Sequence, residues 1–235
     1  LQLCWMSGFL FCLACQLFSP ILEVKEGIME LHVITNGKLS KQQLEDIPRL
    51  MKAVDFLHIR EPQRTARELY DMVHLLLDKG VPANQLIIND RVDLALLMEA
   101  YGVQLGYRSY PIKAVNQLGS KLHVGKSIHS LREALKAENE GADYLVFGHI
   151  FSTRSKEGLP PRGISALQEI VEAVNIPVIA IGGITPNNVT EVMAAGVKGI
   201  AIMSPIWESN NPLKVIEEYQ MKWQHWKEAK GEAKL

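Results

Sequence analysis

One histidine lies where an imidazole can transfer a proton. His149 follows Gly148 at the end of an apolar run, and a loop rich in hydroxyl and cationic side chains comes after it. An imidazole with an unperturbed pKa of about 6.5 takes up and releases a proton near neutral pH. We therefore expect His149 to act in catalysis. The alternative is a histidine that only packs among other polar groups.

A pair of glycines and a serine predict a phosphate site. Gly182 and Gly183 precede Thr185, and Ser204 ends the next apolar run. Exposed backbone N–H groups at such a turn, together with the start of a helix, favour an anion. Two tight turns without a ligand are the alternative.

Other polar residues follow further apolar runs. Arg60 can hold a carboxylate or a phosphate through two hydrogen bonds, or it can pair with the neighbouring Glu61. Arg91 is interpreted as a salt-bridge residue. Asn89 and Asp90 offer a single carboxylate, which is too little for a dedicated magnesium site, so we expect no bound metal.

The loop from Phe151 to Gly163 is longer than most loops between a strand and a helix. It carries Thr153, Arg154, Ser155 and Lys156, all of which can bind an anion. We expect it to be a lid over the site, with a solvated loop as the alternative.

The whole chain has the composition of an ordinary globular domain. Its 235 residues contain 25 Lys and Arg against 26 Asp and Glu, so no excess of positive charge favours nucleic acid. The seven histidines show no close metal-ligand spacing, and the single Cys12-x-x-Cys15 pair is weak evidence for a redox or metal site. No cofactor is expected.

Eight short apolar or β-branched runs alternate with amphipathic helical patterns, which predicts parallel strands. Eight such units predict the α/β class and a single (β/α)8 TIM barrel, with a doubly wound open sheet as the alternative. This fold places its sites at the carboxyl ends of the strands. The runs are Glu30 to Thr35, Phe56 to Glu61, Leu86 to Asp90, Gly102 to Gly106, His123 to Ser127, Tyr144 to Phe151, Pro177 to Gly183 and Gly199 to Ile206.

The helical segments carry their own start signals. Thr65 with Glu68, Ser130 with Glu133, and Ser165 with Gln168 have the spacing of capping boxes, and Thr185-Pro186 suits a first turn. The last helix, from Pro212 to Ala229, has apolar and aromatic side chains at helical spacing. This face is expected to pack on the barrel or to form a subunit contact in a possible homodimer.

We expect residues 29–235 to form the barrel domain. Residues 1–28 are interpreted as a non-native upstream extension, disordered or loosely helical, because Lys25-Glu26-Gly27 before Met29 reads like a translated ribosome-binding site. The apolar stretch from Met6 to Phe18 is shorter than the roughly 20 residues of a membrane-spanning helix, and no basic segment precedes it as in an export signal. We therefore expect a cytoplasmic protein without a membrane partner.

Taken in order, the segments at the strand ends resemble the thiamine phosphate synthase superfamily over Met29 to about Tyr219. They are HIRE, IINDRVDLAL, GVQLG, HVGKSIHS, DYLVFGHIFSTRSKEG, IPVIAIGGITP and GIAIMSPI. The resemblance implies that Thr153, Arg154, Ser155, Gly182, Gly183, Met203 and Ser204 bind a thiazole phosphate. It also implies that Arg60, Asn89, Ser127 and Lys156 line the other half of the pocket, with Lys126 as a further cation nearby.

The chain departs from the synthases of that superfamily, which join a pyrimidine diphosphate to a thiazole phosphate and need magnesium. Pro62 stands at a lysine position, Arg108 and Ser109 replace an acidic pair, and His149 replaces a proline. These departures resemble the TenI branch, which implies a thiazole tautomerase, an isomerase of thiamine biosynthesis with His149 as its proton shuttle. One alternative is an enzyme with thiamine phosphate synthase activity. The other is a non-catalytic protein that binds thiazole phosphate or has a regulatory role.

Overall fold

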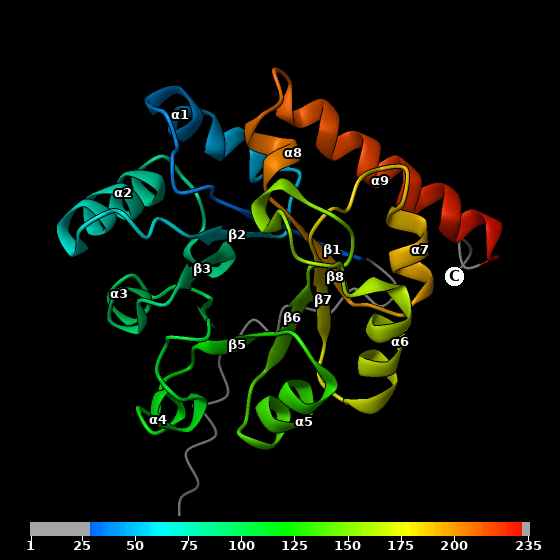
Figure 1. Ribbon diagram of the computed structural model, residues 1–235. Coiled ribbons are helices and arrows are strands. Elements are labelled where there is room, and N and C mark those ends of the chain that lie inside the picture. The colour runs from blue at the N-terminus through cyan, green and yellow to red at the C-terminus, as the bar shows by residue number, and fades with distance from the viewer. Residues whose placement is uncertain (1–28, 232–235) are drawn as a thin grey trace, which may run out of the picture.

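The computed structural model describes residues 29–231, in which eight parallel strands close into one barrel. Helices surround the strands (Figure 1), and β1 pairs with both β2 and β8, so the sheet has no free edge. The predicted (β/α)8 barrel is confirmed, and the open sheet is excluded. The upstream extension and the three cysteines lie outside the described residues. The strands are β1 (Glu30–Ile34), β2 (Phe56–Ile59), β3 (Leu86–Asn89), β4 (Gly102–Leu105), β5 (His123–Ile128), β6 (Tyr144–Gly148), β7 (Val178–Ile181) and β8 (Gly199–Ile202).

The helices follow the strands in alternation. They are α1 (Lys41–Leu50), α2 (Ala66–Asp78), α3 (Val92–Leu97), α4 (Ile112–Asn116), α5 (Leu131–Asn139), α6 (Gly163–Ala173), α7 (Val189–Ala194), α8 (Ser204–Trp207) and α9 (Pro212–Ala229), with short 3-10 turns η1 (Ala83–Gln85) and η2 (Arg154–Lys156).

Helix starts were predicted with mixed success. Thr65 and Glu68 form the expected reciprocal capping box, and the Ser130 side chain accepts from the Glu133 N–H. The start at Ser165 is wrong, because α6 already begins at Gly163 without a side-chain cap. The start at Thr185 is also wrong, because α7 begins only at Val189. Asn188 holds the intervening turn by accepting from the Thr185 N–H at 2.7 Å.

Apolar side chains pack in two places, inside the barrel and between the barrel and the helices. Alternate residues of a strand point to opposite faces, so each strand contributes to both. The inner cluster includes Ile34, Phe56, Tyr144 and Ile179, while the larger cluster joins the outer faces of the strands to the helices. This packing fixes the strand ends that carry the site.

Helix α9 fastens to the barrel as its apolar face predicted. Ile216 and Tyr219 are fully buried, and the Tyr219 hydroxyl donates to the Ile184 carbonyl at 2.7 Å. Trp223 and Trp226 stack with their ring centroids 5.5 Å apart and pack on the same cluster. Between residues 29 and 231, no helix combines the length and apolar character needed to cross a membrane.

Candidate functional site

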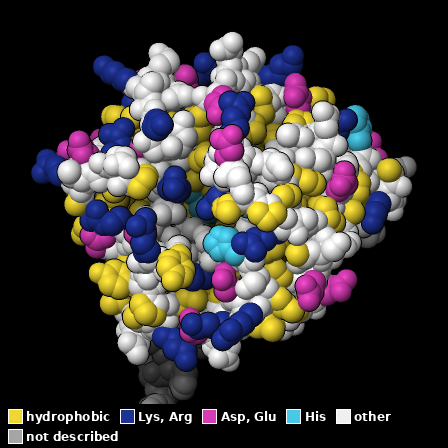
Figure 2. All heavy atoms as spheres, in the orientation of Figure 1, with side chains coloured by type: hydrophobic (Ala, Val, Ile, Leu, Met, Phe, Trp, Pro, Cys, Tyr) yellow, Lys and Arg dark blue, Asp and Glu magenta, His cyan; other side chains and the backbone are white. Residues whose placement is uncertain are grey.

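A pocket of about 670 Å³ opens at the carboxyl ends of the strands. Figure 2 shows a hollow near the middle of this face, with a histidine and several Lys or Arg side chains around it. Of the predicted site residues, twelve line the pocket: Arg60, Asn89, Ser127, His149, Thr153, Arg154, Ser155, Lys156, Gly182, Gly183, Met203 and Ser204. The structure therefore brings together residues that lie far apart in the sequence.

Lys126 is not among the residues that line the pocket. Neighbouring residues of a strand point to opposite faces, and here it is Ser127 that lines the pocket. The Lys126 ammonium instead donates to the Gly106 carbonyl at 2.7 Å, and burial lowers the pKa of its side chain. Lys126 thus holds the end of β4, and the structure does not support its predicted contact with a ligand.

The Gly182-Gly183 turn fits against the loop after β6, and no larger residue can replace either glycine there. A Cβ on Gly182 would lie 2.4 Å from the His149 Cβ, and one on Gly183 would lie 2.6 Å from the Ser152 carbonyl oxygen. Both glycines have positive φ, at +98° and +67°. The two glycines therefore fix the distance between the turn and His149.

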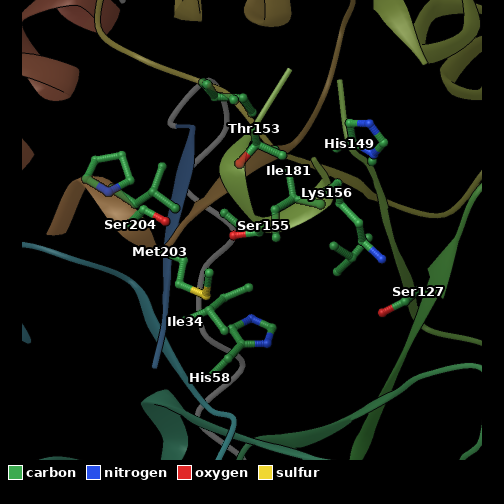
Figure 3. A pocket seen from close by; sticks show the side chains of 18 of the residues that line it. Ile34, His58, Ser127, His149, Thr153, Ser155, Lys156, Ile181, Met203 and Ser204 are labelled. Carbon is green, nitrogen blue, oxygen red and sulfur yellow. The ribbon is translucent and has the colours of Figure 1, made fainter. Parts of the chain in front are cut away.

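The turn leaves hydrogen-bond donors facing the pocket. Within residues 29–231, no hydrogen bond engages the backbone N–H of Gly183 or Ser204. Ser204 also lines the pocket with its hydroxyl-bearing side chain, and Figure 3 shows Ser204 and Met203 on one side of the pocket. Two N–H groups and a hydroxyl at one edge can hold a phosphate.

His149 lies on the side of the pocket opposite Met203 and Ser204 (Figure 3). Its side chain is buried, with 6% of the residue exposed, and its Nε2 lies 3.3 Å from the Leu159 carbonyl oxygen. A carbonyl only accepts, so in the neutral ring Nε2 carries the proton and Nδ1 is left as an acceptor. The loop after β6 therefore sets the tautomer of this ring.

That loop carries its cations over the pocket mouth. Arg154, in η2, forms an ion pair at 3.4 Å with Glu208, which follows α8, while Ser155 and Lys156 line the pocket. The pair is exposed, so it is worth at most about 1 kcal/mol. A weak contact thus joins the loop after β6 to the end of α8. Its action as a lid stays a prediction.

Arg60 lines the pocket and does not form the ion pair with Glu61 that was its alternative role. Glu61 instead pairs with Arg64 at 3.3 Å and accepts from the Gly37 N–H at 3.2 Å. Arg91 pairs with Asp93, as interpreted from the sequence.

Two buried polar residues of the pocket were missed in the sequence. His58 and Gln104 line its floor from β2 and β4. Burial, together with the charge of His32, holds the pKa of His58 well below its usual value. Gln104 donates to the Ser127 hydroxyl at 3.0 Å, while its own carbonyl oxygen has no partner among the described residues. The alternation of β2 offered a signal, because His58 precedes Arg60 by two positions.

The residues present do not fit a magnesium ion held by carboxylates. Asp90 is exposed and does not line the pocket, and the loop after β4 presents Arg108 and Ser109. In the described part of the chain, no three His, Cys, Asp or Glu side chains gather closely enough to hold a metal ion. A hard cation prefers several oxygen ligands, which this site does not offer.

Comparison with known proteins gives a consistent result. The family model described as "Thiamine monophosphate synthase" matches residues 31–206. A thiamine-phosphate synthase of Pyrococcus furiosus is 38% identical over 192 residues, covering 81% of this chain and 92% of that protein. One from Chlorobium phaeobacteroides is 48% identical over 188 residues, covering 77% and 90%.

A solved structure agrees with these relatives. The thiamine phosphate pyrophosphorylase of Pyrococcus furiosus superposes with a TM-score of 0.73 at 34% identity, covering 84% of this chain and 96% of that one. The relatives bear the name of a transferase, so the expected isomerase class is wrong. The sequence placed a titratable ring at the pocket, and position alone does not determine which reaction such a ring serves.

Proposed function

Because the chain belongs to the thiamine monophosphate synthase family, we propose that it is a thiamine-phosphate synthase, a transferase that joins a thiazole phosphate to a pyrimidine diphosphate. The observation that carries the proposal is the agreement of the family match with the pocket. The phosphate-type turn of Gly182 and Gly183 lies in the same cavity as a second group of cationic and polar side chains.

The two halves of the pocket suit two phosphorylated substrates. The thiazole phosphate would bind the free N–H groups of Gly183 and Ser204. The diphosphate would meet Arg60 and Lys156, whose positive charges favour its departure as an anion. This division of the pocket follows the resemblance of the strand-end motifs and stays a proposal.

The test is formation of thiamine phosphate from the two substrates by the purified full chain in a magnesium-containing buffer. We expect product, and an Arg60→Ala variant should raise KM for the diphosphate. Arg64→Ala is the matched control, because Arg64 pairs with Glu61 and does not line the pocket. Absence of product with the wild-type protein would refute the transferase.

A second candidate is a non-catalytic protein that binds thiazole phosphate. It is favoured by Pro62, Arg108 and Ser109, which replace the lysine and the acidic pair expected of synthases of this superfamily. Pro62→Lys separates the two candidates. A synthase with a weakened diphosphate site should gain rate from the added charge, whereas a binding protein should bind thiazole phosphate and form no product with either residue.

A further inference from the structure

A chain of three polar side chains, of which the two histidines are buried, runs through the barrel to the floor of the pocket. It begins at Glu30, the first residue of β1, passes through His32 and ends at His58 on β2. The His32 Nε2 lies 3.4 Å from a Glu30 carboxylate oxygen, and the His32 Nδ1 lies 2.9 Å from the His58 Nε2. Only the last member, His58, lines the pocket.

Both histidine rings are buried. His32 is 2% exposed and His58 is 1% exposed, so water does not compete for the hydrogen bond between the two rings. Lys198 lies 3.6 Å from the other Glu30 oxygen and closes the chain at the opposite end of the barrel. Burial opposes ionisation of Glu30, but the contacts with His32 and Lys198 outweigh it, so its pKa is lowered and it is a carboxylate near neutral pH.

At about pH 8, where an ordinary histidine is neutral, two histidines that share one N–H···N bond have two proton arrangements. A carboxylate accepts only, so the proton of His32 must sit on Nε2, facing Glu30. The His32 Nδ1 is then an acceptor, and the shared bond requires a proton on the His58 Nε2. One carboxylate at the bottom of the barrel thereby selects one arrangement for both rings.

The remaining nitrogen of His58 is the one available to a ligand. Among the described residues, the hydrogen bond with His32 is the single one made by the His58 ring. Figure 3 shows His58 beside Ile34 and Met203, with Ser127 across the pocket. An unprotonated Nδ1 at this position accepts from an N–H or O–H group and repels another acceptor.

We propose that Glu30 and His32 are positioning residues, which hold His58 in the tautomer with its proton on Nε2 and so give the pocket floor a hydrogen-bond acceptor for a donor group of the ligand. The role differs from that of Ser204 and the glycine turn, which offer donors to an anion. It also differs from packing, because packing alone involves no contact between the His58 Nδ1 and a ligand.

The test is nitrogen NMR of the histidine rings in the ¹⁵N-labelled full chain, without ligand, at about pH 8, where an ordinary histidine is neutral. Two-bond nitrogen–proton correlations distinguish a protonated ring nitrogen from a bare one. We expect a protonated Nε2 and a bare Nδ1 in His58. A proton on Nδ1 in the wild-type protein would overturn the proposal, without need of any variant.

Variants then test the part played by Glu30. An amide can donate as well as accept, so Glu30→Gln should leave His58 as a mixture of tautomers. Lys198→Met is the matched control, because it removes a neighbouring charge and keeps the carboxylate, and its His58 should match the wild type. An unchanged His58 in a folded Glu30→Gln variant would contradict the positioning role.

A last measurement tests whether Nδ1 faces the ligand, and this part rests on the proposed function. Thiazole phosphate added to the labelled protein should shift the His58 Nδ1 signal, while exposed His74, held by Asp78 on α2, serves as the internal reference. Calorimetry first establishes that the probe binds. Failed binding would count against the proposed function, whereas binding without a shift at His58 would count against the assignment of Nδ1 to the pocket.

Discussion

Replacement of Gly182 by alanine should damage both the stability of the barrel and the pocket. The added Cβ would lie 2.4 Å from the His149 Cβ and 2.7 Å from its Cα, contacts that cannot form without movement of the backbone. A forced left-handed conformation costs about 1–2 kcal/mol, and an overpacked site about 1–3 kcal/mol more. We expect Gly182→Ala to lower the free energy of unfolding by about 2–5 kcal/mol.

A second glycine separates the two contributions. Gly80 has a similar φ of +85°, against +98° for Gly182, but nothing lies within 4 Å of its Cβ position. Gly80→Ala should therefore cost only the conformational part, about 1–2 kcal/mol. Urea unfolding at equilibrium measures both differences. If the two variants lose equal stability, the close approach of Gly182 to His149 does not exist as described.

The same pair of variants tests the pocket. Gly182→Ala should weaken binding of thiazole phosphate at least about tenfold, equivalent to about 1.4 kcal/mol, because the turn must move away from the loop after β6. Gly80→Ala should leave the affinity unchanged, since Gly80 lies outside the pocket. Calorimetric titration gives both affinities.

Three further changes test other contacts. Ser204→Asp should weaken thiazole phosphate binding about tenfold or more through like-charge repulsion. Ser209→Asp, at a position that does not line the pocket, should leave the affinity unchanged. Equal affinities of the two variants in calorimetry would mean that the phosphate does not bind at this edge of the pocket. Tyr219→Phe removes a buried hydrogen bond and should cost about 1–2 kcal/mol in urea unfolding, and no loss would mean that this bond does not hold α9. Burial and the charge of His32 lower the pKa of His58 well below 6.5, so below that pH the unfolded chain binds a proton that the folded chain does not. Stability should fall as the pH drops from about 7 to 5, by up to about 1.4 kcal/mol per pH unit, and His58→Phe should flatten this slope; an unchanged slope would place the cause elsewhere.

The architecture could be predicted because each unit carries its own local signals. Thr65 and Glu68 have the spacing of a reciprocal cap, and the structure shows both hydrogen bonds. The predicted strand ends at Phe151, Gly183 and Ile206 lie beyond the observed ends of β6, β7 and β8. Apolar side chains continue past the last hydrogen bond between the strands and join the larger hydrophobic cluster. Apolar character reports burial, and it does not show where the chain leaves the sheet.

The site could be predicted best at the carboxyl ends of the strands. Arg60, Asn89 and Ser204 lie at or just beyond such ends and line the pocket, as does Ser127 near the end of β5. His58 and Gln104 lie within strands. The position of His58 two residues before Arg60 was a signal for the first, whereas the inward direction of Gln104 depends on a register that one sequence does not give. The same uncertainty placed Lys126 in the pocket, although its side chain holds the end of β4.

The reaction could not be read from the residues alone. His149 lies at the pocket as expected, yet the isomerase inferred from it is wrong in view of the relatives, which are named as transferases. A buried ring with one bare nitrogen suits proton transfer, hydrogen bonding to a ligand and simple packing equally well.

The attachment of α9 bears on how the chain acquires its site during synthesis. The Tyr219 hydroxyl holds the Ile184 carbonyl, one residue beyond the glycine turn, and β1 finds its second partner only in β8. A chain still on the ribosome therefore exposes one edge of β1 until residue 202 has emerged, and the turn lacks its outer support until residue 219 follows. During synthesis, closure of the sheet and completion of the pocket thus cannot precede the emergence of these last segments.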